Sequence, residues 1–285
     1  IEIEPKMVDA ARHYRTHVSR AFDDPRSNIV YADARTFFSS DPARYDLIIS
    51  EPSNPWVSGI ATLFTEEFYL RAHASLADDG LFVQWIHGLE ISLSLIGSVV
   101  KALGNAFDDY ALYNLNGRDL MFIAGPKGKV HLDSGAVLSM PQLRDDMTKV
   151  GAKTARDLRV RYLGSRATME PLLVSYPPPA NSDYFPVLDV GAVRARFMRQ
   201  DALALLALRR LSLPILDMLE PHRQDPRLAP MTITDQFIQS TAVHAGKTFV
   251  ASLGTGYDEW ARTMPTWLES LRVKAELVWP TCGVS

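Results

Sequence analysis

Strand-like and helix-like segments alternate along residues 1–125, and this alternation leaves the chain few folds. Short apolar runs lie at residues 1–3, 28–33, 47–50 and 80–86, and segments with helical spacing lie at residues 6–18, 66–76 and 91–103. Such alternation predicts parallel strands joined by right-handed helical crossovers. Asn116 and Gly117 then mark the turn of a hairpin that adds an antiparallel edge strand. The sequence therefore predicts an α/β protein with a doubly wound, mostly parallel sheet.

The apolar run at residues 47–50 ends abruptly at a carboxylate. Its continuous apolar character predicts a strand covered on both faces, and Glu51 follows it directly, ahead of Asn54, Pro55 and Trp56. Open α/β sheets bind their ligands at the carboxyl ends of the strands. We therefore expect Glu51 and its neighbours to lie at a ligand site.

Acidic residues also follow the two preceding predicted strands. Glu2 or Glu4 follows the first strand, and Asp33 follows the second. Strand-end carboxylates can accept hydrogen bonds from the ribose hydroxyls and the adenine amino group of a nucleoside. The same acids can also cap the helices that begin behind them. Three in succession favour a nucleoside site, although any one of them alone favours a cap.

Composition excludes several classes of function. The net charge of −3 and the lack of a dense basic stripe argue against a nucleic-acid partner. The single cysteine, Cys282, cannot form an internal disulfide, and no Cys/His spacing typical of zinc sites occurs. No apolar run approaches the length of a membrane span. We expect a chain that works in a reducing compartment without a metal.

The pattern changes along the chain and predicts three parts. Residues 1–130 are expected to form the nucleoside-binding catalytic domain. Residues 131–190 have a largely helical pattern and are expected to complete or cover that domain. Residues 191–285 are expected to form a helical carboxyl-terminal extension, to which the sequence assigns no chemistry.

Four stretches, in order and spacing, resemble a known family: IEIEPKMVDAARHY, VYADARTFF, YDLIISEPSNPWVSGIATLFTEEFY and GLFVQWI. They resemble the spermidine synthase-like branch of the S-adenosylmethionine-dependent methyltransferase superfamily, over roughly the first half of the chain. The resemblance is closest to bacterial proteins in which such a domain is fused to a transporter-like membrane region. PPPANSDYFPVLDV resembles the stretch near the end of the catalytic region in those proteins.

The resemblance implies a role for each strand end. On the donor side it implies that Glu2 holds the ribose, that Asp33 and Ala34 hold the adenine, and that Ser50 also lies at the donor. Glu51 falls where polyamine synthases carry the aspartate that takes a proton from the attacking amine. The expected acceptor-binding residues are Asn54, Trp56, Gln84 and Tyr113. His87 and Tyr110 are weaker candidates for the same pocket.

The chain also departs from the family pattern. Polyamine synthases carry Asp-Ser-Ser-Asp-Pro where this chain has Glu-Pro-Ser-Asn-Pro, so a neutral amide, Asn54, replaces the second acid. Putrescine as the acceptor is therefore in doubt. The glycine-rich turn and the amino-terminal hairpin domain of the family would lie upstream of residue 1. We expect the sheet of this chain to be incomplete at its amino end, and the chain alone to be inactive.

The leading expectation is aminopropyl transfer from decarboxylated S-adenosylmethionine to a small amine. Methyl transfer from S-adenosylmethionine to an amine is the first alternative, because an Asn-Pro-aromatic turn can hold a planar nitrogen. A non-catalytic nucleoside-binding module is the second, because the amide at Asn54 removes a polyamine acid. The resemblance further implies a cytoplasmic location, a membrane region in the full-length protein and a homodimer.

Overall fold

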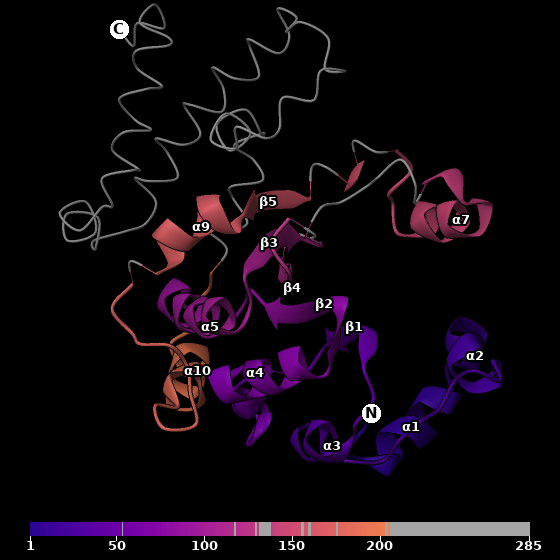
Figure 1. The fold of residues 1–285 in the computed structure, drawn as a ribbon, viewed down its shortest axis with the longest axis horizontal. Coiled ribbons are helices and arrows are strands. Elements are labelled where there is room, and N and C mark those ends of the chain that lie inside the picture. The colour runs from indigo at the N-terminus through magenta and orange to yellow at the C-terminus, as the bar shows by residue number, and fades with distance from the viewer. Residues whose placement is uncertain are drawn as a thin grey trace, which may run out of the picture.

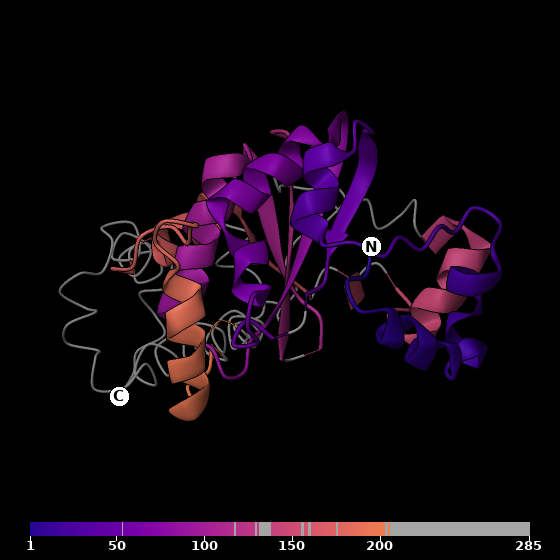
Figure 2. The same ribbon diagram turned by 90° about the horizontal axis from the view of Figure 1, so that it is seen from below.

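A five-stranded sheet forms the centre of the protein. A computed structural model describes residues 1–202 and 205, apart from residues 53, 117, 129, 131–137, 155–156, 159–160 and 175. The strand order is β1-β2-β4-β3-β5, and helices α3, α4 and α5 line one face of the sheet (Figures 1 and 2). The strands are β1 (Tyr45–Ser50), β2 (Leu76–His87), β3 (Asp109–Asn114), β4 (Asp119–Gly125) and β5 (Tyr162–Ser165).

The pairing within this sheet is mixed. β1 and β2 run parallel, with Ser50 opposite Gln84. The β2–β4, β3–β4 and β3–β5 pairs are all antiparallel. The predicted α/β class and the hairpin at residues 109–125 are therefore confirmed. Among the described strands, however, parallel pairing is limited to β1 and β2, because the hairpin and β5 extend the sheet with antiparallel strands.

The first two predicted strands form only a minimal pair. Residues 1–3 and 28–33 meet at one parallel bridge between Glu2 and Tyr31. The Glu2 N–H donates to the Val30 carbonyl at 2.9 Å, and the Ala32 N–H donates to the Glu2 carbonyl at 3.2 Å. The chain's amino terminus lies close to β1 in both views (Figures 1 and 2).

The helix expected at residues 6–18 is divided in two. α1 (Pro5–Arg12) is followed by its C-cap, His13, and α2 (Arg15–Asp23) begins after its N-cap, Tyr14. An exposed ion pair of 3.4 Å between Arg20 and Asp146 connects α2 to α7 (Pro141–Lys149). These helices lie together to one side of the sheet (Figures 1 and 2).

Polar caps begin each of the helices that line the sheet. The side chains of Asp33, Thr65 and Ser92 accept a backbone N–H in the first turn of α3 (Ala34–Ser40), α4 (Glu66–Ala74) and α5 (Leu93–Ala106), respectively. Such caps satisfy amides that have no partner inside the helix. In α4 two acids follow the cap and two basic residues close the helix, which suits the helix dipole.

Aromatic side chains fill the layer between the sheet and these helices. Phe82 of β2 is fully buried. Its ring stacks on Phe107 at 5.3 Å and meets the edges of Tyr69 and Phe68 at 5.5 and 6.4 Å. Burial of this set contributes both transfer free energy and ring–ring contacts.

β1 is covered on one face only, within the described part of the chain. Ile48 is buried, but Leu47 and Ile49 are 51% and 63% exposed. The prediction of a strand covered on both faces is therefore wrong for the residues described. The reason is that α3, α4 and α5 lie on the Ile48 side, and β1 is the first strand of the sheet.

The segment after residue 130 includes a strand that the helical pattern did not predict. β5 pairs with β3 and buries Leu163 completely, and α9 (Arg166–Leu173) follows it directly. α10 (Val187–Phe197) runs across the predicted boundary at residues 190/191. The division into three parts remains a prediction, and helices predicted beyond residue 205 lie outside the described residues.

No helix in the described ranges is both long and apolar enough to cross a membrane.

Two glycines of α5 allow a test of how closely α9 packs on it. A Cβ at Gly97 would clash with the backbone carbonyl of Leu173, whereas one at Gly104 would meet only the end of the Glu170 side chain, at 3.0 Å. Alanine raises helix propensity by about 1 kcal/mol at either site. We expect Gly97→Ala to destabilise the protein by about 1–3 kcal/mol through overpacking, and Gly104→Ala to be neutral or stabilising.

Urea unfolding of the two variants measures the difference. Equal changes in their unfolding midpoints would show that α5 and α9 do not approach as closely as described.

Candidate active site

Glu51 lies just beyond the carboxyl end of β1. The strand ends at Ser50, which is opposite Gln84, and the parallel β2 continues past it to His87 on the same side of the sheet. The Glu51 side chain is exposed, and it makes no hydrogen bond or ion pair with any described residue. A carboxylate without a partner in the described part of the chain is available to a ligand.

The loop that follows Glu51 is held in a defined conformation. Pro52 and Pro55 are buried. The Asn54 carbonyl accepts the Val57 N–H at 3.0 Å, which closes a turn. Gly59 has φ +84°, in the left-handed region that favours glycine, and it leads into the 3₁₀ helix η1 (Ile60–Phe64).

Trp56 in this loop is half-buried, and one face of its ring is occupied. The Arg196 guanidinium of α10 lies 4.9 Å from the ring centroid, which is a cation–π distance. The Asn54 side chain is also half-buried. The turn therefore places both residues within five positions of Glu51, and α10 (Val187–Phe197) contacts it directly.

Gln84 connects the end of β1 to β2 from inside the core. Its side chain is fully buried and donates to the carbonyls of Ser50 at 3.2 Å and Trp85 at 2.8 Å. Its Oε1 has no partner among the described residues. Buried polar atoms are rarely left unsatisfied, so this oxygen is a candidate acceptor for a ligand N–H.

His87 and Asp119 form a pair at the end of β2. The two residues are opposite each other across β2 and β4, and the His87 Nδ1 is hydrogen-bonded to Asp119. The imidazole stacks on Trp85, with ring centroids 5.8 Å apart. His87 is thus oriented by a carboxylate, and the structure supplies a partner, Asp119, that the sequence did not identify.

The donor-side acids have structural partners. Asp33 Oδ1 accepts from both the backbone N–H and the hydroxyl of Thr36, at 2.8 and 2.9 Å, so it caps α3. Glu2 accepts from the Glu4 N–H at 2.9 Å, and Glu4 in turn caps α1. The cap interpretation is therefore confirmed for Asp33, and its second carboxylate oxygen remains available. Ala34, directly after Asp33, is half-buried.

The two hairpin tyrosines lie away from Glu51. Tyr110 is fully buried in the main core, and burial raises the pKa of its hydroxyl well above the ordinary value. Tyr113 packs edge-on against Tyr162, at 5.3 Å. β3 is three strands from β1, which corresponds to roughly 14 Å at the usual spacing. The structure thus does not bring Tyr113 together with the other predicted site residues.

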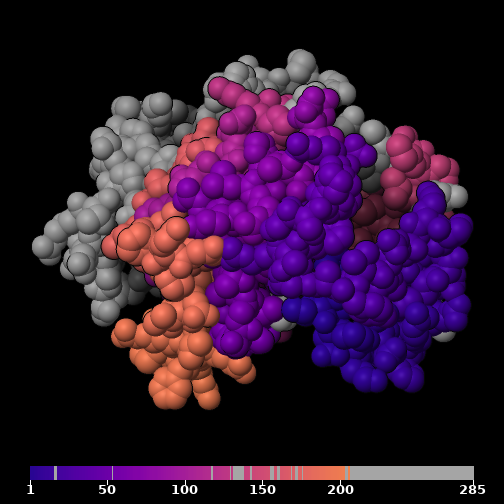
Figure 3. All heavy atoms as spheres, turned by 60° about the horizontal axis from the view of Figure 1, so that its bottom comes forward, coloured from indigo at the N-terminus to yellow at the C-terminus, as the bar shows by residue number. Residues whose placement is uncertain are grey.

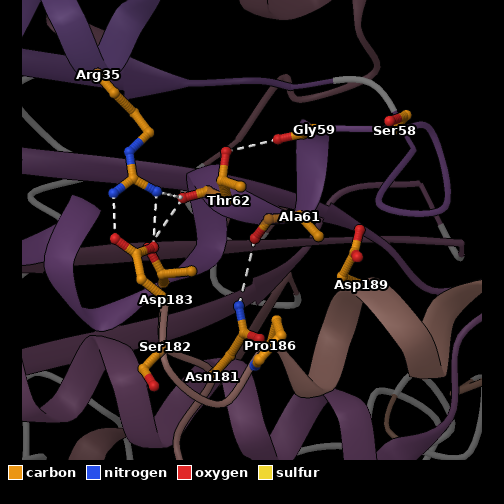
Figure 4. A pocket seen from close by; sticks show the side chains of 11 residues that line it. Arg35, Ser58, Gly59, Ala61, Thr62, Asn181, Ser182, Asp183, Pro186 and Asp189 are labelled. Atoms are coloured by element: carbon orange, nitrogen blue, oxygen red, sulfur yellow. Dashed lines mark hydrogen bonds and ion pairs between the residues drawn. The ribbon is translucent and has the colours of Figure 1, made fainter.

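A cavity of about 480 Å³ lies beside the loop after β1. One wall is formed by residues 58–62 and Thr65, and the opposite wall comes from residues 181–189, which are far along the sequence (Figure 4). Arg35 of α3 closes one end through a bidentate ion pair with Asp183, and Asp189 of α10 lines the other. Figure 3 shows α10, in orange, packed against the violet surface of the first half of the chain.

Arg35, Asn181 and Asp183 were not predicted to be at the site. Asn181 and Asp183 belong to the quoted stretch PPPANSDYFPVLDV, but nothing in their spacing indicated partners more than 100 residues away. Arg35 follows Ala34 directly, and this position was the only available signal.

The ion pair at the cavity predicts a specific pH dependence. The hydrogen-bonded Arg35 guanidinium lowers the pKa of the Asp183 carboxyl below its ordinary value. A lowered pKa in the folded state stabilises the protein above the unfolded pKa of about 3.9, and this contribution is lost as the pH falls through the lower folded value. We expect Asp183→Asn to be less stable than the parent at pH 6 and to approach it in stability below pH 3.9.

Urea unfolding of both proteins at pH 6, 4 and 3 measures this difference. A gap in stability that stays constant with pH would show that the pair is not ionised as described.

Comparison with known proteins identifies the amino-terminal part. Residues 1–116 match the family model described as the spermine/spermidine synthase domain. The polyamine aminopropyltransferase of Thermotoga petrophila is 36% identical over 81 residues, which are 28% of this chain and 27% of that protein. The enzyme of the same name from Caldicellulosiruptor saccharolyticus is 30% identical over 113 residues, 40% of each chain.

Among solved structures, spermidine synthase from Thermotoga maritima aligns with a TM-score of 0.40 and 24% identity, over 49% of this chain and 50% of that one. The chain spans less than half the length of the two sequence relatives that it matches. The sequence match nevertheless contains Glu2, Asp33 and the whole stretch from Glu51 to Gln84. Residues 1–116 of this chain are similar to a spermine/spermidine synthase domain.

Proposed function

We propose that the protein transfers an aminopropyl group from decarboxylated S-adenosylmethionine to an amine. The observation that carries this proposal is the free Glu51 carboxylate at the carboxyl end of β1, inside the part of the chain that matches the spermine/spermidine synthase domain. The names of the two sequence relatives, both polyamine aminopropyltransferases, support the same reaction.

The chemistry requires a proton acceptor at this place. The amine nitrogen attacks the carbon next to the sulfonium, a C–N bond forms, and the C–S electron pair returns to sulfur. The leaving thioether needs no acid, but the nucleophile must be a free amine. An alkyl ammonium has a pKa of about 10.4, so deprotonation at pH 7 costs about 4.6 kcal/mol. We assign Glu51 the role of orienting the amine and accepting its proton.

The donor is assigned to the strand ends on the amino-terminal side. Glu2 would accept the ribose hydroxyls, and Asp33 would use the oxygen that does not cap α3 to accept from the adenine amino group. Ala34 and Ser50 would line the same site. The half-burial of Ala34 and Ser50 is compatible with a ligand packed against the strand ends.

The acceptor amine is assigned to the loop after β1. Asn54, Trp56 and the buried Gln84 oxygen are the groups proposed to bind it. Tyr113 remains a predicted acceptor contact, and its distance across the sheet makes it the weakest of the four. The neutral Asn54 leaves the second nitrogen of a diamine without the acid found in polyamine synthases.

Methyl transfer from S-adenosylmethionine to a planar nitrogen is the second candidate. The turn Asn54-Pro55-Trp56 favours it, but Arg196 already occupies one face of the Trp56 ring. For this reason we place aminopropyl transfer ahead of methyl transfer. A non-catalytic nucleoside-binding module is the alternative if no transfer occurs.

We place the reaction in the cytoplasm, and the single cysteine, Cys282, supports a reducing compartment. A homodimer and a membrane region in a longer protein stay predictions, as does the absence of a metal. Among the residues described, no three His, Cys, Asp or Glu side chains gather as metal ligands would.

Replacing Glu51 by Gln tests the proton acceptor. Glu51→Gln keeps the shape of the side chain but removes its basic oxygen, so we expect turnover to fall by about 10²–10⁴-fold, with unchanged donor affinity. Asp46→Asn is the matched control, because it removes an exposed carboxylate from the other end of β1. Turnover is measured with both donors and a panel of amines. Full turnover in Glu51→Gln would reject Glu51 as the proton acceptor.

Two replacements of Asp33 separate capping from donor binding. Asparagine caps helices about as well as aspartate, whereas alanine loses about 1 kcal/mol of stability. We expect both Asp33→Asn and Asp33→Ala to weaken binding of an adenosine-containing thioether by about 1–3 kcal/mol. Each of them removes the second carboxylate oxygen, which does not cap α3 and is assigned to the adenine amino group. Only Asp33→Ala should lower the unfolding midpoint. Calorimetry that finds parental affinity in both variants would leave Asp33 with the capping role alone.

A further inference from the structure

Three side chains of residues 181–196 hold the connection between β1 and α4, two by direct contact and one through Arg35, which donates to the Thr62 carbonyl. Asn181 binds the carbonyls of η1, Asp183 binds Arg35 beside it, and Arg196 covers Trp56. We call these three residues the clamp. Resting on the proposed function, we propose that the clamp is the positioning element of the acceptor side, because it fixes the loop that carries Glu51, Asn54 and Trp56.

Asn181 is the centre of the clamp. It is 1% exposed, and its Nδ2 donates to the carbonyls of Ala61 and Phe64 at 3.3 and 3.0 Å. Its Oδ1 accepts the Leu188 N–H at 3.0 Å, and its carbonyl accepts the Glu66 N–H at 2.9 Å. The Asn181 side chain therefore joins η1 to the start of α10, and its backbone carbonyl adds the start of α4.

Asp183 extends this connection to α3. Arg35 Nη1 donates to Asp183 at 2.8 Å and to the Thr62 carbonyl at 3.3 Å, and Nη2 makes the second bond of the bidentate pair. The Asp183 N–H donates to the Glu67 carboxylate at 2.9 Å. Bidentate Arg–carboxylate pairs fix geometry as well as adding energy. The pair thus sets the position of η1 relative to the helix that follows Asp33.

Arg196 holds the loop at its other end. It lies seven residues after Asp189 on α10, so both face the loop, and its Nε also lies 3.5 Å from Glu90 in the segment after β2. α10 thereby contacts Trp56 with one turn and lines the cavity with another. The clamp therefore holds the loop at Trp56, within its turn, and at η1, after the turn.

This arrangement does more than add stability. The clamp lies outside the part of the chain that matches the synthase domain, which ends at residue 116. It nevertheless contacts the segment between Glu51 and α4 at two places, the Trp56 ring and the carbonyls of η1. A misplacement of about 1 Å in a reacting group can cost about 10²-fold in rate. A loop held by distant side chains is therefore sensitive to their loss.

Asp183→Asn in the full-length protein tests the clamp. It leaves the side-chain shape but removes the charge that pairs with Arg35. Glu170→Gln is the matched control, since the Arg166–Glu170 pair at 2.8 Å is similarly half-buried but lies on α9, away from the loop. Hydrogen exchange of residues 56–66, calorimetric donor affinity, and KM and kcat for the amine are measured in both.

We expect Asp183→Asn to speed amide exchange in residues 56–66 and to lower kcat/KM for the amine by about tenfold or more, with donor affinity unchanged within about twofold. The charge-swapped double variant Arg35→Asp with Asp183→Arg should restore both the parental amide exchange of residues 56–66 and the parental kcat/KM for the amine. Glu170→Gln should leave exchange in residues 56–66 and amine kinetics at parental values.

Two results would overturn the proposed role of the clamp. One is unchanged amide exchange of residues 56–66 in Asp183→Asn, and the other is faster exchange there with unchanged amine kinetics. Absence of any transfer by the parent protein would instead contradict the proposed function, while the exchange result would still decide whether residues 181–196 hold the loop.

Discussion

The parallel pairing of β1 with β2 determines where this protein places its polar groups. Parallel strands end at the same edge of a sheet, and they require a crossover, supplied here by η1 and α4. Glu51 follows one strand, and His87 closes the other. The buried Gln84 amide of β2 connects to the end of β1 through the Ser50 carbonyl. Without this pairing, the carboxylate, the Trp56 turn and the buried amide oxygen would have no common location.

The crossover itself depends on polar contacts from a distant part of the chain. Aromatic packing around Phe82 holds α4 on the sheet, and the apolar residues of η1 pack on the same core, but its carbonyls also need hydrogen-bond donors. Asn181 satisfies carbonyls of η1 that a short 3₁₀ helix leaves without partners. Rigid placement of the loop after β1 is therefore a property of the whole described chain and not of residues 1–116 alone.

Local patterns predicted most of this arrangement. Apolar runs located β1 and β2, the Asn-Gly signal located the β3–β4 hairpin, and the order of the motifs pointed to the synthase-like domain. The patterns failed where distant packing decided the outcome. β5 is a strand because β3 offers it an edge, and Leu47 and Ile49 are exposed because the described helices lie on the other face. Arg35 and Asp183 meet across 148 residues, which no spacing rule reveals.

The central claim is that the free carboxylate at the end of β1 serves aminopropyl transfer. The most direct measurement is mass spectrometry of the full-length protein incubated with a panel of monoamines and diamines and either decarboxylated or intact S-adenosylmethionine. The account predicts an amine product that gains an aminopropyl group, together with methylthioadenosine, and only with the decarboxylated donor. A product that gains a methyl group from the intact donor, or no product with either donor, would contradict it.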